Sequence, residues 1–172
     1  MQVFFYDIVD KLALGNARRC DSLDELLEQA ETISLHVDGR PSNRGFFGAQ
    51  EFAKMRPRSL FLNLSRGFVV DTAALKDALD SGHLAGAAVD VFETEPKRNG
   101  QEFTNPLRGT PNVILTPHVA GSTEEAQQNI GSFVAGKLAD YVESGSTVLS
   151  VNLPPVQAIR GEGRRITHLH QN

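Results

Sequence analysis

The sequence of 172 residues contains a single cysteine, Cys20. One thiol cannot form a disulfide within the chain, and lone free cysteines are typical of reducing compartments. No apolar run has the length of a membrane-spanning helix, and no segment has the pattern of a signal peptide. We therefore expect a cytoplasmic protein without a membrane partner.

Positive charge is also scarce. The chain has 17 Lys and Arg against 21 Asp and Glu, which gives a formal net charge of -4. Nucleic-acid-binding domains carry a basic surface, so we expect no nucleic-acid partner. Internal repeats and low-complexity segments are absent as well. With 40% hydrophobic and 22% charged residues, the composition is that of a globular protein with one domain or slightly more.

Short apolar segments alternate with helical or turn segments along most of the chain. Strands are predicted at residues 3–6, 32–37, 59–64, 85–89 and 113–115. Ser22, with Glu25 three residues later, predicts the start of a helix, and residues 50–55 predict a second, short helix. Asp71 predicts the N-cap of a third helix that ends at Gly82. This alternation predicts an α/β fold with a parallel sheet covered on both faces.

The last of these strands leads into a histidine. Val113–Leu115 is an unbroken apolar run, which is typical of a strand buried on both faces. Ser122, followed by Glu125, predicts a capping box for a long helix. His118 therefore lies at the carboxyl end of a strand, where open α/β sheets bind ligands. An imidazole at that edge is a candidate acid/base.

Polar side chains follow every predicted strand, and right-handed crossovers would gather them at one edge of the sheet. They are Asp7, His36, Asn63, Ser65, Arg66, Asp90, Glu95 and His118. Hydride transfer from a secondary alcohol needs a base, a carboxylate that orients the base and a cation that holds the substrate. His118, Glu95 and Arg66 fit these roles in that order. Asp7 is placed to accept hydrogen bonds from ribose hydroxyls, which favours NAD over NADP.

Each of these residues also has a structural interpretation. His118 alone would be interpreted as a hydrogen-bonded structural residue. The presence of Glu95 and Arg66 at matching strand ends favours a catalytic role. Glu93 and Glu95 lie in the same polar turn, so their residue types do not distinguish them. Asp90 could cap a turn. We expect His36 to be structural because it has no charged neighbour in sequence.

Three stretches of the chain resemble the signature stretches of the D-isomer-specific 2-hydroxyacid dehydrogenases, in the same order and spacing. They are residues 63–67 (Asn-Leu-Ser-Arg-Gly), 90–96 (Asp-Val-Phe-Glu-Thr-Glu-Pro) and 116–123 (Thr-Pro-His-Val-Ala-Gly-Ser-Thr). Residues 99–103, 122–131 and 151–154 further resemble the branch of that family that oxidises 3-phosphoglycerate, in its bacterial form with a short linker before a regulatory ACT domain. The resemblance covers essentially the whole chain.

The resemblance implies a function and a set of site residues. His118 would be the acid/base, Glu95 its partner and Arg66 the carboxylate anchor. The implied contacts to NAD are Asp7, Leu64, Ser65, Arg66, Asp90, His118, Val119, Ala120 and Gly121. The implied reaction is the NAD-dependent oxidation of 3-phosphoglycerate to 3-phosphohydroxypyruvate, the first step of serine biosynthesis. A homo-oligomer (dimer or tetramer) is implied too, with serine as a possible effector at positions matching His170 and Asn172.

The resemblance also divides the chain. It implies an NAD-binding domain over 1–122, a helix and segment returning to a substrate domain over 123–153, a linker over 154–165 and the start of an ACT-like domain over 166–172. The family's G-x-G-x-x-G turn lies about 20 residues before the acidic position, and the chain has no such motif. We therefore expect an incomplete Rossmann-like doubly wound sheet in a fragment that is inactive alone. Its missing strand would separate residues 3–6 and 32–37 from the other three strands.

Two other functions stay open. Family members that act as transcriptional corepressors keep the same residues, so a non-catalytic NAD-binding or oligomerisation module is the first alternative. A dehydrogenase for another D-2-hydroxy acid is the second. A formate dehydrogenase is disfavoured because the family's formate members have glutamine where Glu95 stands. His168 and His170 share one face of a predicted strand, but two ligands without a third predict no metal site.

Overall fold

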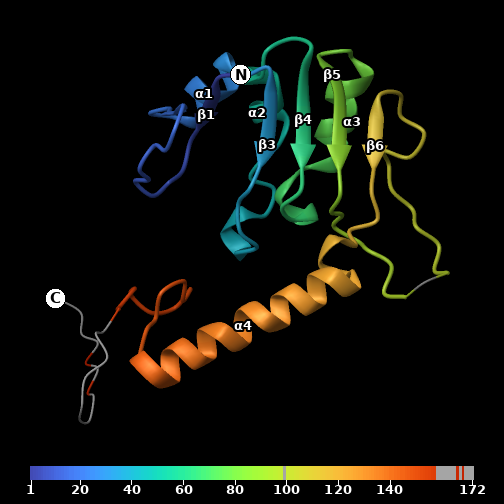
Figure 1. Ribbon diagram of the computed structural model, residues 1–172. Coiled ribbons are helices and arrows are strands. Elements are labelled where there is room, and N and C mark those ends of the chain that lie inside the picture. Colours follow the sequence, from blue (N-terminus) through green and yellow to red (C-terminus); the bar gives the residue numbers. More distant parts are fainter. Residues whose placement is uncertain (99, 158–165, 167, 169–172) are drawn as a thin grey trace. The chain divides into compact units, whose positions relative to one another are not determined.

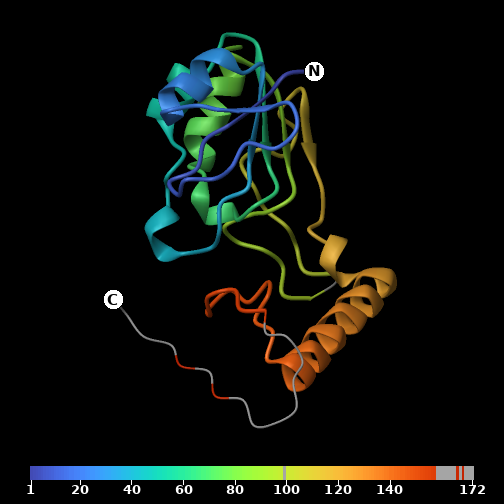
Figure 2. The same cartoon turned by 60° about the vertical axis from the view of Figure 1, so that its left-hand side comes forward.

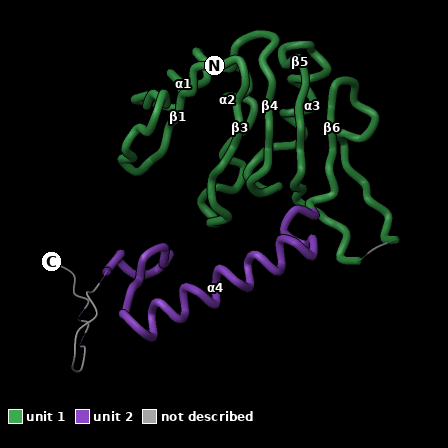
Figure 3. The backbone as a smooth tube through the Cα atoms, in the orientation of Figure 1, with its two compact units in different colours: residues 1–118 green, residues 119–172 purple. Residues whose placement is uncertain are grey.

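The computed structural model describes residues 1–98, 100–157, 166 and 168. It divides into two compact units, residues 1–118 and 119–172, which Figure 3 distinguishes by colour. In the described part, no helix is both long and apolar enough to cross a membrane. Most of the predicted linker and the positions His170 and Asn172 lie outside the described residues. The predicted domain boundaries therefore stay predictions.

The first unit contains two parallel sheets (Figure 1). The larger sheet has the sequential order β3 (Thr32–Leu35), β4 (Ser59–Asn63), β5 (Leu84–Val89) and β6 (Val113–Leu115). The smaller sheet pairs β1 (Val3–Phe5) with β2 (Ala17–Arg19). All five predicted strands are thus confirmed. β2 was not predicted, because its sequence Ala-Arg-Arg has no apolar pattern.

The break between the two sheets is not where the sequence analysis placed it. We expected residues 32–37 to lie on the same side of the missing strand as residues 3–6. That expectation was wrong, because β3 pairs with β4 along its whole length, from Thr32 opposite Leu60 to Leu35 opposite Asn63. The break lies between the β1–β2 sheet and the four-stranded sheet that begins with β3. Overlooking β2 made β3 look like the neighbour of β1.

Three helices of the first unit pack against one face of the larger sheet (Figure 2). They are α1 (Leu23–Gln29), α2 (Ala49–Lys54) and α3 (Thr72–Asp80). At the centre of this core, the rings of Phe47, Phe52 and Phe61 contact one another with centroids 4.9 to 5.0 Å apart. All three side chains are almost fully buried. Burial of large aromatic side chains is the main stabilising contribution at this interface.

The opposite face of the same sheet is open within the first unit. Leu60 is 45% exposed and Ile114 is 65% exposed. The sequence analysis predicted cover on both faces, and for this unit that was wrong. The strands follow one another in a single direction across the sheet, so right-handed crossovers place every connecting helix on the same side.

The helix starts were predicted with one error. Ser22 accepts the N–H of Glu25, and Asp71 accepts the N–H groups of Ala73 and Ala74, as capping residues do. In the second unit, however, the cap of α4 (Glu124–Ser144) is Thr123, whose hydroxyl accepts the N–H of Ala126. The predicted cap, Ser122, instead closes the short 3-10 helix η3 (Ala120–Ser122). Ser and Thr are both good capping residues, and the preceding turn decides which of the two neighbours caps the helix.

Candidate active site

The carboxyl end of β4 is organised by a buried amide. Asn63 is 1% exposed, and its Oδ1 accepts both the backbone N–H and the hydroxyl of Ser65, at 3.1 and 2.9 Å. Its Nδ2 donates to the carbonyl of Arg66 at 3.1 Å. These bonds fold the chain into a tight turn that leads into the 3-10 helix η2 (Gly67–Val69). The turn therefore holds the backbone of Arg66 at the sheet edge.

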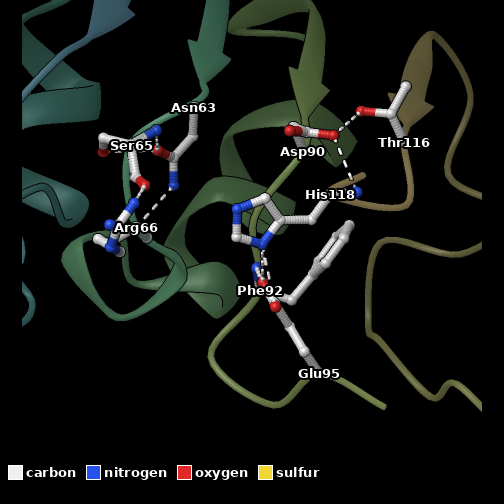
Figure 4. A network of polar contacts seen from close by, with 8 residues as sticks. All are labelled: Asn63, Ser65, Arg66, Asp90, Phe92, Glu95, Thr116 and His118. Atoms are coloured by element: carbon white, nitrogen blue, oxygen red, sulfur yellow. Dashed lines mark hydrogen bonds and ion pairs between the residues drawn. The ribbon is translucent and has the colours of Figure 1, made fainter. Parts of the chain in front are cut away.

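The ends of β5 and β6 are joined by Asp90. Its Oδ1 accepts the hydroxyl of Thr116 at 2.5 Å and the backbone N–H of His118 at 3.1 Å (Figure 4). His118 has a φ of 51°, in the left-handed region that non-glycine residues rarely adopt. Such a backbone costs on the order of 1 kcal/mol, which the charge-assisted bond to Asp90 offsets. The end of β5 thus holds the backbone of His118 in this conformation.

The imidazole of His118 faces a carboxylate. Its Nδ1 lies 3.0 Å from both Oε1 and Oε2 of Glu95. The Oε1 atom also accepts the backbone N–H of Phe92 at 2.9 Å, which fixes the carboxylate. Both side chains are partly exposed, with 40% and 37% of their surfaces accessible. A carboxylate at Nδ1 favours a proton on that nitrogen and leaves the Nε2 lone pair to act as a base.

Arg66 lies on the other side of the imidazole in the view of Figure 4. Its Nη1 donates to the carbonyl of Ser65 at 2.7 Å. The side chain lies beside Gly39, where an added Cβ would be 3.4 Å from Nε, so the glycine leaves room for the guanidinium. Arg66 is exposed, and its planar group keeps further N–H donors that could bind a carboxylate in bidentate fashion.

The remaining predicted site residues are spread more widely. Asp7, at the end of β1, accepts the N–H of Val9 at 2.9 Å. The hydrogen-bonded Asp38 and, more weakly, Asp7 raise the pKa of Arg40. His36, one residue after β3, contacts the hydroxyl of Ser34 at 2.9 Å, which is a neutral partner. Leu64 is 50% exposed beside Ser65, whereas Val119, Ala120 and Gly121 belong to the second unit.

Several residues that shape this edge were missed by sequence reasoning. They are Thr116, Phe92, Gly67 and Arg44. Thr116 and Phe92 lie in the recognised stretches. Phe92 acts through its backbone N–H, which carries no sequence signal, and the hydroxyl of Thr116 reaches Asp90, 26 positions earlier in the sequence. In the described ranges, no three His, Cys, Asp or Glu side chains gather as metal ligands.

Residues 1–120 match the model of the D-isomer specific 2-hydroxyacid dehydrogenase, NAD binding domain. The chain belongs to this family. It is 54% identical over all 172 residues to D-3-phosphoglycerate dehydrogenase of Escherichia coli (strain K12), and 49% identical over 173 aligned positions to the protein of that name from Haemophilus influenzae. The chain spans 42% of the length of each of these relatives.

Solved structures of the same family have the same fold. The NAD-complexed D-isomer specific 2-hydroxyacid dehydrogenase from Lactobacillus delbrueckii ssp. bulgaricus superposes with a TM-score of 0.70 at 28% identity. The match covers 82% of this chain and 45% of that one. D-mandelate dehydrogenase from Rhodotorula graminis gives a TM-score of 0.72 at 29% identity, over 82% and 41% of the two chains. The Rossmann-like α/β class predicted from sequence is confirmed.

NAD is the cofactor of this domain family, and the residues of this chain fit part of it. The half-buried carboxylate of Asp7 is ordered by Val9 and suits ribose hydroxyls. Exposed Leu64 offers an apolar contact at the sheet edge. A pyrophosphate requires clustered backbone N–H donors, and the 172 residues contain no G-x-G-x-x-G turn to supply them. The chain thus offers a carboxylate and an apolar side chain to the cofactor, and no glycine-rich turn for its pyrophosphate.

Proposed function

We propose that this chain supplies the acid/base pair and part of the NAD site of a D-3-phosphoglycerate dehydrogenase. The observation that carries the proposal is the contact of His118 Nδ1 with both oxygens of Glu95, at 3.0 Å. The reaction is the oxidation of 3-phosphoglycerate to 3-phosphohydroxypyruvate. The similarity to enzymes of that name, at 54% and 49% identity, supports this choice of substrate.

Each residue of the pair has a defined part in the proposed oxidation. When bound, NAD accepts the hydride that leaves the alcohol carbon of the substrate. His118 takes the hydroxyl proton on Nε2, so that a C=O bond replaces the C–OH bond. Glu95 holds Nδ1 and stabilises the imidazolium that forms. Reduction runs through the same groups in reverse.

Arg66 binds the substrate carboxylate in this proposal. A guanidinium forms two parallel hydrogen bonds with a carboxylate, which fixes the neighbouring carbon relative to the base. The turn built on Asn63 supports this role, because it holds the backbone of Arg66. The proposed cofactor contacts are Asp7, Leu64, Ser65, Arg66, Asp90, His118 and residues 119–121, with Asp7 on the ribose hydroxyls.

We further propose a cytoplasmic homo-oligomer with the predicted domain order 1–122, 123–153, 154–165 and 166–172. The single thiol of Cys20 supports the compartment. Exposed apolar side chains on α4, including Phe133, Leu138 and Tyr141, support self-association. Sedimentation of the purified chain at several concentrations tests this, and a monomer at every concentration contradicts it.

The test of the main proposal replaces the aligned residues of the Escherichia coli enzyme with this chain and follows NADH formation from 3-phosphoglycerate. We expect turnover within about tenfold of the unmodified enzyme, a difference of about 1.4 kcal/mol in barrier. Circular dichroism and an NADH titration establish that the chimera is folded and binds the cofactor. A folded chimera that binds NADH and oxidises no 3-phosphoglycerate contradicts the proposal and favours a non-catalytic NAD-binding module.

A further inference from the structure

Gly67 has no room for a side chain. A Cβ at this position would lie 1.9 Å from the carbonyl carbon of Phe92 and 2.3 Å from the backbone nitrogen of Glu93. Both are backbone atoms, so they cannot rotate away as the end of a side chain can. The φ of Gly67 is outside the left-handed region, so space rather than backbone angle requires glycine here.

The close contact joins two turns that carry different parts of the site. On one side, Gly67 directly follows Arg66. On the other side, the backbone N–H of Phe92 donates to Oε1 of Glu95 at 2.9 Å, and the same carboxylate faces Nδ1 of His118. The position of the Phe92 turn therefore decides where the carboxylate lies against the imidazole.

The Phe92 turn is also held from other directions. Its ring packs edge-on against Phe103, with centroids 4.7 Å apart. The backbone N–H of Asp90, two residues earlier, donates to the carbonyl of Asn63 at 3.1 Å. A side chain at position 67 would push against a turn that cannot simply move aside.

We propose that Gly67 is a positioning residue for the acid/base pair, an inference that rests on the proposed function. Its missing side chain lets the Phe92–Glu93 peptide lie against the Arg66 turn, and this places the Phe92 N–H where it holds Glu95. In Gly67→Ala the peptide is displaced, Phe92 releases the carboxylate and His118 loses its partner at Nδ1. The imidazole then loses its preference for a proton on Nδ1.

The tautomer of His118 is the direct readout. We compare the ring ¹⁵N signals of the purified 172-residue chain, without cofactor and at a pH where the imidazole is neutral, and assign them with His118→Gln. Wild type should carry the proton on Nδ1. Gly67→Ala should shift the population toward Nε2–H, and so should Glu95→Ala, which removes the acceptor at Nδ1. Gly131→Ala is the matched control, because a Cβ there meets nothing within 4 Å, and it should match wild type.

The outcomes separate this inference from the proposed function. A folded Gly67→Ala chain with the wild-type tautomer overturns the role of Gly67 alone. A wild-type chain with its proton on Nε2 overturns the acid/base geometry and this inference with it. Neither readout needs NAD or turnover.

A second variant covers the case in which Gly67→Ala does not fold. Adding Phe103→Ala removes the ring behind the Phe92 turn and gives that turn space to retreat. We expect the double variant to fold with the Nε2–H tautomer, and Phe103→Ala alone to keep Nδ1–H. A double variant that keeps Nδ1–H overturns the proposal.

Discussion

Glu93 pairs with Arg44, 49 positions earlier in the sequence, at 2.7 Å between Oε1 and Nη1. The same Arg44 guanidinium lies 5.0 Å from the centroid of the Phe68 ring, which fixes its direction. Glu93 is thereby held away from the imidazole, and Glu95 is the carboxylate that contacts His118. The structure thus distinguishes two acids that share one turn.

Because only Glu95 contacts His118, two matched substitutions in the chimera should differ in their effect on kcat. Glu95→Gln removes the charge that stabilises the imidazolium, so we expect kcat to fall by about 10²-fold. Glu93→Gln removes only an exposed ion pair, which contributes roughly 0–1 kcal/mol, so kcat should change by less than about fivefold. Steady-state rates of NADH formation measure both. Equal losses in the two variants would remove the special role of Glu95.

Asp7 should govern both the affinity and the choice of nicotinamide cofactor. Asp7→Ala deletes a charged acceptor for ribose hydroxyls, worth about 1.5 kcal/mol, so the Kd for NADH should rise about tenfold. The affinity for NADPH should improve relative to NADH, because the repulsion of a 2′-phosphate is gone. Fluorescence titrations of the chain measure both affinities. Asp10→Ala, at a side chain 87% exposed, is the control, and a Kd that rises equally there refutes the assignment.

Sequence patterns predicted which residues gather at the sheet edge better than they predicted the contacts between those residues. His118, Arg66 and Asp90 were singled out because each follows a strand, and the parallel sheet brings those ends to one edge. Glu95 was chosen over Glu93 on the resemblance to the family. The pairing of Glu93 with Arg44 was out of reach, since it depends on two loops far apart in sequence.

The errors in the predicted fold also come from interactions that leave no clear pattern in the sequence. β2 is stabilised by backbone pairing to β1 and by the Cys20 N–H bond to the carbonyl of Phe5, neither of which requires apolar side chains. Thr123 was passed over because its neighbour Ser122 has a glutamate, Glu125, three residues later, whereas the residue three positions after Thr123 is Ala126. The demand for glycine at Gly67 comes from a backbone that is distant in sequence, so composition cannot reveal it.

The first helix should make stability depend on acidity. The backbone N–H of Asp21, and next the amide of Gln29, hold the pKa of Glu25 below its usual value. A lowered folded pKa gives stabilisation that is present above the unfolded pKa of about 4.3 and is lost as pH falls through the folded pKa.

Urea unfolding measured between about pH 3 and pH 7 tests this link. The wild-type midpoint should fall more steeply on acidification than that of Glu25→Gln. Glu102→Gln, at an exposed loop glutamate, should follow wild type. Parallel curves for wild type and Glu25→Gln would show that the hydrogen bonds of Glu25 do not contribute to the pH dependence of stability.

The aromatic cluster should dominate the stability of the first unit. Phe61→Ala removes a fully buried ring that contacts Phe47 and Phe52, so the free energy of unfolding should fall by about 3–5 kcal/mol. Phe133→Ala, at a ring 54% exposed, should cost less than about 1 kcal/mol. Urea denaturation followed by circular dichroism compares the two, and similar losses would contradict the cluster's central place in the core.

The most direct test of the account is His118→Gln in the chimera with the Escherichia coli enzyme. Glutamine keeps a polar side chain but cannot take up the hydroxyl proton, so kcat should fall by at least about 10²-fold. The Kd for NADH should stay within about twofold, because His118 is one of several predicted cofactor contacts and the others, including Asp7, are untouched. That result would establish His118 as the acid/base of a dehydrogenase. Turnover at the unmodified rate would contradict the central claim.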